Sequence, residues 1–560
     1  MRWEKKQRDT VVFACPNHQI LLEIEGKKHP KSLSAPLNSL KPELLISNFN
    51  NIIFPRHSNI KQIRKLFRDS YKSAHLIVLP ASLLRIGEAA FFQSKLKYCI
   101  LTRNSQIQFI DKDAFFKTKR FDSLRMPPAI ETFGEKAFAY SNIKYISFPS
   151  KLKEIPFEAF RNCSLLSSIE IPGSVERIGD YTFTGTNLQS LTFLPNSNVQ
   201  YIGEHSFSNC KRLTSINIPP SAKVISNFAF CDSSCQSITF APNSQLETIN
   251  RAAFQSCPNI VSLEIPSCVK EIGAYAFSNA GLQSIHFGLH SNIRKISICS
   301  FQYCMKLTSI AIPSNVEEID IYAFANNGLE SITFASDSRL KTIQDFAFSG
   351  CCKLSSICFP SSLEKLGKRL FSQSSISTIT FMPNSRLTTI SKEVFRGCGN
   401  LKSIFLPPAL ERIEEFAFSN TTFSKVDFSP DSNLKVIESF AFRECFNLSC
   451  VEIPSSVEVI DEGAFVDSNL KSVVFSSDSK LKKIGKGAFQ RCALEKVYIP
   501  SSVEVIENYA FADCVQLTHI FIAPESKLQK VPCDVFQGCP NLQSVDFPIL
   551  IETDSVSEPC

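Results

Sequence analysis

Residues 451–511 read VEIPSSVEVIDEGAFVDSNLKSVVFSSDSKLKKIGKGAFQRCALEKVYIPSSVEVIENYAF, and the phrase IPSSVEVI occurs twice in this stretch. Each copy leads to a Phe that follows an Ala, at Phe465 and at Phe511. A looser copy, KLKKIGKGAF, lies between them and ends at Phe489. A short apolar unit is therefore repeated about every 23 residues, and self-similarity at such a period is typical of repeat architectures.

The Phe of this unit recurs along most of the chain, and we call these residues the ladder Phe. From Phe160 to Phe489 the spacing alternates between 23 and 24 residues without a break. The true period is therefore 47 residues, and each period holds two related coils. The 21 ladder positions are Phe67, Phe91, Phe115, Phe138, Phe160, Phe183, Phe207, Phe230, Phe254, Phe277, Phe301, Phe324, Phe348, Phe371, Phe395, Phe418, Phe442, Phe465, Phe489, Phe511 and Phe536.

Each coil contains the pattern L-x-S-I-x-[IF], which predicts a β-strand with the apolar residues on one face and Ser on the other. The pattern V-E-x-I-x-x-x-A-F supplies a return leg and places the ladder Phe in the interior. A single coil has nothing to cover its apolar face, so neighbouring coils must stack into a continuous solenoid. Burial of each Phe is expected to contribute roughly 1.5–3 kcal/mol.

The repeated pattern L-x-S-I-x-I-P…V-x-x-I-G-x-x-A-F…C…L resembles the BspA-like subclass of leucine-rich repeats, which is found in surface proteins of oral bacteria and in large families of protist parasites. The match is clearest at Leu329–Phe348 and at Val451–Phe511. The resemblance implies a β-rich solenoid of the α/β-type leucine-rich-repeat class. We expect a curved or superhelical stack of about 21 coils of 22–25 residues, with one strand per coil and a short return strand or a 3-10 or helical turn.

The repeats divide the chain into three parts. Residues 1–44 do not follow the period, and we expect an N-terminal cap or degenerate repeats there. Residues 45–548 are expected to form the solenoid as one domain, because no long Gly/Ser- or Pro-rich linker interrupts them. Residues 549–560 are a polar tail.

Nine of the 21 cysteines recur every 47 residues, once per two coils. Neighbouring strands lie about 4.8 Å apart, so these thiols should lie about 9–10 Å apart, whereas a disulfide needs Cα atoms within about 7 Å. Members of this series cannot pair with each other, and small buried filler is their expected role. Cys514 holds the same place in the coil between Cys492 and Cys539, so a disulfide there is left open.

Charge is distributed unevenly along the chain. Residues 1–150 hold 25 Lys and Arg against 12 Asp and Glu, a balance of +13, whereas the remainder has a balance of −6. A basic end could contact nucleic acid, anionic lipid or an acidic glycan. The cluster Lys61, Arg64, Lys65 and Arg68 is mixed with core residues, however, and no nucleic-acid-binding motif accompanies it. We therefore expect a solvated coil edge and no nucleic-acid partner.

No constellation of residues predicts catalysis, a cofactor or a bound metal ion. His286 and His290 are four residues apart, but they fall on a predicted strand and its turn rather than on one helix face. Neither a phosphate-binding loop nor a nucleophile motif is present. We expect that the protein is not an enzyme and that its function depends on its surface.

The outward positions of the predicted strands form two columns, and one column is nearly all Ser from Ser168 to Ser356. Towards the C-terminus these columns become apolar and aromatic, with cations beside them. An exposed aromatic strip with a cationic rim is typical of a protein-binding hot spot, although the chain's own C-terminal segment could instead cover it. The candidate partner-binding residues are Phe405, Val474, Lys496, Tyr498, His519 and Phe521.

Two functions lead from the sequence, and a third, association of the basic N-terminal third with nucleic acid or a membrane surface, ranks below both. The family resemblance implies a surface antigen that binds a protein or glycan on host cells, matrix or other microbes. The alternative is an intracellular leucine-rich-repeat scaffold, which fits the unpaired thiols and the lack of an evident export signal or lipid anchor. No run of 18 apolar residues predicts a membrane span, and the location and oligomeric state are not predicted.

Overall fold

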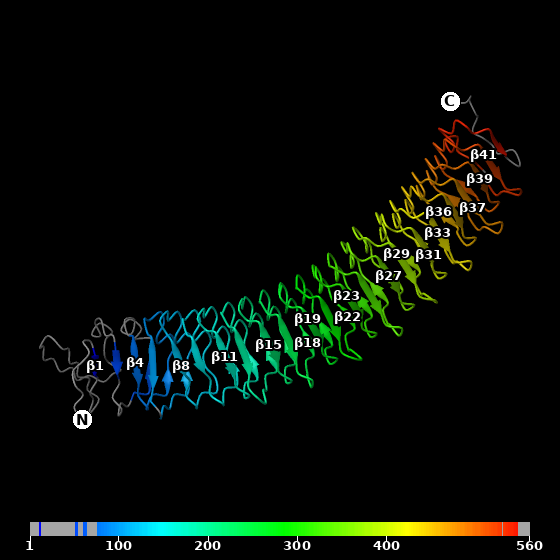
Figure 1. The fold of residues 1–560 in the computed structure, drawn as a ribbon. Helices are drawn as coiled ribbons and strands as arrows, with labels where there is room; N and C mark the ends of the chain where they lie inside the picture. The colour runs from blue at the N-terminus through cyan, green and yellow to red at the C-terminus, as the bar shows by residue number, and fades with distance from the viewer. Residues whose placement is uncertain are drawn as a thin grey trace. The chain divides into compact units, whose positions relative to one another are not determined.

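The structure, a computed structural model, describes residues 10–12, 51–53, 60–63, 75–102, 104–528 and 530–546. The chain divides into two compact units, Met1–Val269 and Lys270–Cys560. Each unit is a stack of coils in which a long strand and a short strand alternate, with turns between them (Figure 1). No helix occurs among the described residues, so the return leg is a short strand followed by hydrogen-bonded turns and not a helical turn.

In the first unit, the first six long strands form one parallel sheet, and the later long strands pair in parallel two at a time. The short strands form parallel sheets of their own. The long strands are β1 (Thr10–Val12), β2 (Asn51–Ile53), β4 (Leu76–Leu79), β6 (Tyr98–Leu101), β8 (Ser123–Arg125), β9 (Tyr145–Ser147), β11 (Ser168–Ile171), β13 (Ser190–Phe193), β15 (Ser215–Ile218), β17 (Ser237–Phe240) and β19 (Ser262–Ile265). The short strands are β3 (Gln62–Ile63), β5 (Arg85–Ile86), β7 (Phe109–Ile110), β10 (Glu154–Ile155), β12 (Arg177–Ile178), β14 (Tyr201–Ile202), β16 (Val224–Ile225) and β18 (Thr248–Ile249).

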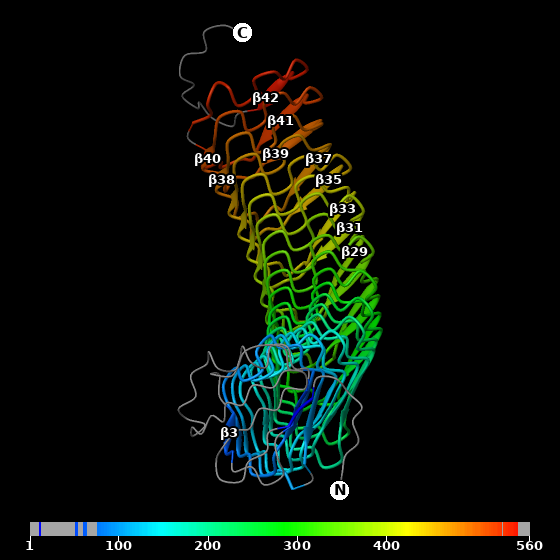
Figure 2. The ribbon, with the colours of Figure 1, turned by 90° about the vertical axis from the view of Figure 1, so that its left-hand side faces the viewer.

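The second unit has the same plan, with long strands on one side and short strands on another, as β39 and β40 show in Figure 2. The long strands are β21 (Ser284–Phe287), β23 (Ser309–Ile312), β25 (Ser331–Phe334), β27 (Ser356–Phe359), β29 (Thr378–Phe381), β31 (Ser403–Leu406), β33 (Lys425–Phe428), β35 (Cys450–Ile453), β37 (Ser472–Phe475), β39 (Lys496–Ile499), β41 (His519–Ile522) and β42 (Ser544–Asp546). The short strands are β20 (Glu271–Ile272), β22 (Lys295–Ile296), β24 (Glu318–Ile319), β26 (Thr342–Ile343), β28 (Lys365–Leu366), β30 (Thr389–Ile390), β32 (Arg412–Ile413), β34 (Val436–Ile437), β36 (Val459–Ile460), β38 (Lys483–Ile484) and β40 (Val505–Ile506).

The ladder Phe form the centre of each core, as predicted. Those from Phe91 to Phe511 are buried. In the second unit, the ring centroids of successive ladder Phe from Phe277 to Phe511 lie 5.0 to 5.8 Å apart. This spacing is slightly wider than the strand spacing of about 4.8 Å, and it allows the rings to stack with an offset. Phe67 lies outside the described residues.

The ladder Phe sits in what we call the turn segment, the five residues from two before it to two after it. The first and last residues of nearly every turn segment have a positive φ; in the coil of Phe324 these are Tyr322 (54°) and Asn326 (53°). Backbone N–H groups of the turn segment donate to the next coil, as Phe324 does to Ala347 O at 2.9 Å. These bonds satisfy backbone groups beside the buried ring, where an unpaired group would be costly.

The recurrent cysteines follow the ladder Phe by three residues and have a hydrogen-bonding role. Cys492 Sγ donates to Phe465 O of the preceding coil at 3.2 Å and lies 3.3 Å from Ser468 Oγ. The other recurrent cysteines repeat the bond to the preceding ladder Phe. The prediction of buried filler is therefore right for eight of the nine, since Cys539 is half-buried, but it leaves out the hydrogen bond that each thiol donates.

Cys492, Cys514 and Cys539 are free thiols, so the structure does not form the disulfide that the sequence left open. Cys514 Sγ donates to Phe489 O at 3.2 Å, which is the bond that its neighbours in the series make.

The predicted N-terminal cap lies almost wholly outside the described residues, except that β1 pairs in parallel with β2. The polar tail, residues 549–560, and the basic residues Arg64, Lys65 and Arg68 also lie outside them. The division of the chain at residues 44 and 548 stays a prediction.

Candidate functional site

Five of the six predicted partner-binding residues come from three successive long strands. Val474 is on β37, Lys496 and Tyr498 are on β39, and His519 and Phe521 are on β41. β39 and β41 pair in parallel, with Tyr498 opposite Phe521 and Lys496 opposite His519. These five residues form what we call the aromatic strip.

The rings of the aromatic strip stack on one another at the surface. The centroids of Tyr498 and Phe521 are 4.6 Å apart with an interplanar angle of 14°, and those of His519 and Phe521 are 5.9 Å apart. Tyr498 is 62% exposed and Val474 is 48% exposed, whereas Phe521 is half-buried. The alternation of side chains along a strand places all of these residues on the outer face, opposite the buried Val497 and Ile520.

Phe405 is not part of the aromatic strip. It is 55% exposed on β31. Its register partner on the next long strand is Asp427, and the register partner of Val474 is Glu452 on β35. Two acidic coils therefore separate Phe405 from Val474.

The predicted rim residues Lys496 and His519 are the first residues of β39 and β41, beside the rings of Tyr498 and Phe521. Lys496 is exposed, and His519 Nδ1 lies 2.9 Å from Thr518 Oγ1. On the side of β35, the exposed Glu452 borders Val474. The segment that was expected as an alternative cover, residues 549–560, lies outside the described residues.

The residues of the predicted Ser column face solvent, and their small polar side chains offer no apolar contact to a partner. In the first unit Ser168 pairs with Ser190, and Asn217 with Thr239, whose Oγ1 donates to Asn217 Oδ1 at 3.2 Å. His286 lies on β21 and His290 in the following turn, as predicted. Nowhere in the described part of the chain do three or more His, Cys, Asp and Glu side chains gather in a group able to hold a metal ion.

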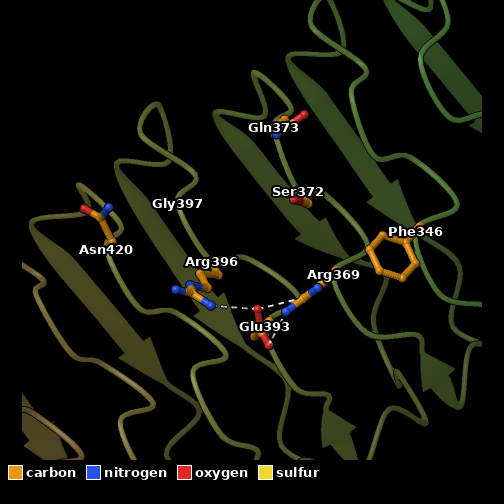
Figure 3. A pocket seen from close by; sticks show the side chains of 8 residues that line it. All are labelled: Phe346, Arg369, Ser372, Gln373, Glu393, Arg396, Gly397 and Asn420. Carbon is orange, nitrogen blue, oxygen red and sulfur yellow. Dashed lines mark hydrogen bonds and ion pairs between the residues drawn. The ribbon is translucent and has the colours of Figure 1, made fainter.

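A second candidate site, which the sequence did not predict, lies on the turn segments of the second unit. It is a pocket of about 360 Å³ lined by Phe346, Arg369, Ser372, Gln373, Glu393, Arg396, Gly397 and Asn420 (Figure 3). Phe346, Arg369 and Glu393 all stand two residues before a ladder Phe, and Gln373, Gly397 and Asn420 all stand two residues after one. The signal that could have revealed the pocket is therefore the column of residues at a fixed offset from the ladder.

Glu393 joins two arginines in the wall of this pocket. Arg369 Nε and Nη2 donate to its two carboxylate oxygens at 2.8 and 3.1 Å, and Arg396 Nη1 donates to Oε2 at 2.9 Å. The carboxylate side chain is only 8% exposed. Its burial acts to raise the pKa of Glu393, but the hydrogen bonds and charges of Arg369 and Arg396 outweigh that effect and lower the pKa below its ordinary value.

A model of the BspA type leucine-rich repeat region matches overlapping segments that run from residue 45 to residue 555. The chain belongs to the BspA-type leucine-rich repeat family. A search of curated protein sequences gives no match. In the part of this BspA-type protein that the structure describes, no helix has the length and apolar character of a membrane span.

Solved structures of leucine-rich repeat proteins are similar to this BspA-type chain. A leucine-rich repeat protein from Bacteroides ovatus is 25% identical, with a TM-score of 0.39, over 76% of this chain and 86% of that one. A leucine-rich cell surface protein from Faecalibacterium prausnitzii is 25% identical, with a TM-score of 0.31, over 58% of this chain and 83% of that one. Family membership depends on the family match and not on these likenesses.

Proposed function

We propose that this BspA-type repeat protein is a non-catalytic binding protein that holds a protein partner through the aromatic strip. The observation that carries the proposal is the exposed stack of Tyr498 on Phe521, flanked by Val474 and Lys496. Binding hot spots are enriched in Tyr and Trp, and two stacked rings give a rigid apolar contact that loses little conformational entropy on binding. The catalytic alternative has no supporting constellation of residues.

The setting that we propose is adhesion at a cell surface, as the family resemblance implies. The partner would be a protein of host cells, matrix or another microbe. An apolar and aromatic pocket beside one carboxylate would complement a strip with Lys496 on its flank.

The test compares the double variant Tyr498→Ala/Phe521→Ala with the single variant Phe405→Ala. Phe405 is an exposed aromatic residue on a long strand of the same unit, but it lies outside the strip, so it controls for loss of a surface ring. Binding of the purified, fluorescently labelled protein to epithelial cell monolayers and to immobilised fibronectin and laminin would be measured. We expect the double variant to bind about 30-fold more weakly, with an unchanged melting temperature.

Two results would count against this proposal. One is binding by the double variant that equals that of the unmodified protein. The other is an equal loss of binding in Phe405→Ala, which would mean that binding does not depend on the aromatic strip in particular.

A second candidate is an intracellular scaffold that uses the same strip. It is favoured by exposed free thiols at Cys352, Cys358, Cys450 and Cys533, because oxidising compartments favour the conversion of exposed thiols into disulfides. Protease treatment of intact cells separates the two settings, since a displayed protein is cut and an internal scaffold is protected.

A further inference from the structure

One of the positions that line the pocket on the turn segments, Gly397, lacks a side chain. Two residues after the ladder Phe, other coils carry Asn326, Gln373 and Asn420, whereas this coil has Gly397 with φ +72°. A methyl group added at Gly397 would meet no atom within 4 Å. At Gly350, by contrast, the added group would collide with the side chain of Asn326 from the preceding coil. A side chain at position 397 would therefore enter open space beside the pocket, whereas at position 350 the side chain of Asn326 already fills that space.

Two guanidinium groups in the wall of this hollow are held by Glu393, and each keeps N–H groups that make no hydrogen bond to the described residues. Glu393 fixes Arg369 through two hydrogen bonds and Arg396 through one. The two arginine side chains remain 49% and 51% exposed. Among the described residues, Arg369 Nη1 and the Nε and Nη2 of Arg396 have no hydrogen-bond partner. Two cations against one carboxylate leave the wall with a net charge of +1, which favours an anionic ligand.

An aromatic ring, Phe346, and two amide side chains, Gln373 and Asn420, also line the pocket. Arg369 lies over the ring of Phe346, 6.0 Å from its centroid, and Tyr322 stacks against the same ring at 4.9 Å. In Figure 3, Gln373 and Asn420 lie on two different turns, away from the ion pairs of Glu393. Amide groups both donate and accept hydrogen bonds, which suits the hydroxyl groups of a sugar.

We propose that this pocket binds a carboxylate-bearing sugar, such as a sialic or uronic acid unit of a glycan. The carboxylate would take the free N–H groups of Arg396 and Arg369, and the hydroxyls would contact Gln373 and Asn420. A volume of about 360 Å³ is at the small end of the range for ligand pockets, which suits one sugar unit. This site lies on turn segments and the aromatic strip on long strands, so the proposal does not depend on the strip.

A purely structural role for the Arg369–Glu393–Arg396 cluster would explain the ion pairs between coils. It would not explain the pocket beside the cluster, which Gln373 and Asn420 also line. The two interpretations differ in what happens when the hollow is filled while the ion pairs are kept.

The test fills the hollow with Gly397→Asn. Asn occupies the same place in five other coils, with φ between +53° and +57°, so the backbone should accept it. The matched control is Gly399→Asn, because an added group there also meets no atom within 4 Å but Gly399 does not line the pocket. A second pair is Arg396→Gln, which leaves Glu393 paired with Arg369, against Arg386→Gln, which removes an exposed arginine outside the pocket.

Saturation-transfer NMR and calorimetry with the full chain would use N-acetylneuraminic acid, D-glucuronic acid, D-glucose and inorganic sulfate as probes. We expect one or both acidic sugars to bind, to bind more weakly as salt is raised, and to lose about tenfold or more in affinity in Gly397→Asn and in Arg396→Gln. The two controls should bind normally. Which acid binds more tightly distinguishes a sialylated from a uronic-acid glycan.

Three results would overturn the proposal. These are failure of both acidic sugars to bind, equal binding of D-glucose or sulfate, and full binding by a correctly folded Gly397→Asn variant. Circular dichroism of each variant confirms the fold.

Discussion

Each ladder Phe from Phe301 to Phe489 contacts a ladder ring on either side, so its burial stabilises two interfaces between coils. The ring of Phe465 lies 5.0 Å from that of Phe442 and 5.3 Å from that of Phe489, with planes within 3° of parallel. It is wholly buried. A cavity at this position would remove contacts with both neighbours, and the stacked backbone leaves little room for collapse.

We predict that Phe465→Ala lowers the free energy of unfolding by about 3–5 kcal/mol. The matched control is Phe446→Ala, because Phe446 belongs to the same unit but is 58% exposed and should cost no more than about 0.5 kcal/mol. Urea denaturation followed by circular dichroism measures both. Equal losses in the two variants would show that the ladder does not stabilise the unit.

The backbone conformation of the turn segment could not be predicted from the sequence, although the strands and the ladder could. The periodicity of apolar residues predicted the ladder, the outward Ser column and the residues of the aromatic strip. It could do so because the alternation of apolar and polar residue types indicates which side chains face the core. The left-handed residues could not be predicted in this way. Tyr322, Phe346 and Glu393 all have positive φ, although Gly and Asn are the residues that usually mark such positions.

The pocket was not predicted because it depends on contacts between neighbouring coils. An added group at Gly397 would meet no atom, whereas at Gly350 the side chain of Asn326 fills the space, and this difference shows only when neighbouring coils are compared in three dimensions. The charge of the pocket depends on Arg369 and Arg396 meeting across a coil boundary at Glu393. Neither relation is visible in a single repeat.

Asn209 stands two residues after a ladder Phe, is exposed, and has a left-handed backbone conformation with φ +57°. We predict that Asn209→Val destabilises the protein by about 1–2 kcal/mol, because a branched Cβ is strained in this region. Asn209→Gly should change stability by only a few tenths of a kcal/mol, because Gly adopts this conformation without strain. Urea midpoints of the two variants test this, and an equal effect of Val and Gly would contradict it.

At the scale of the whole molecule, the recurrent thiols make stability depend on alkaline pH. Burial raises the pKa of Cys304, Cys351, Cys398, Cys445 and Cys492 from the ordinary value of 9.0 to about 12. Below about pH 9 these thiols are protonated in both the folded and the unfolded states, so their contribution to stability is fully present. Between about pH 9 and pH 12 only the unfolded chain loses these protons, so stability falls as pH rises.

We predict that each such thiol steepens the loss of folding free energy by about 1.4 kcal/mol per pH unit above about pH 9. The double variant Cys445→Ser/Cys492→Ser tests this, because Ser does not ionise in this range and can still donate to the carbonyls of Phe418 and Phe465. Urea midpoints measured from pH 8 to pH 10 should fall less steeply in the variant than in the unmodified protein, whatever the cost of the substitution at pH 8. Parallel curves would mean that the buried thiols do not ionise on unfolding and that alkaline sensitivity arises elsewhere, in the lysines and tyrosines of the surface.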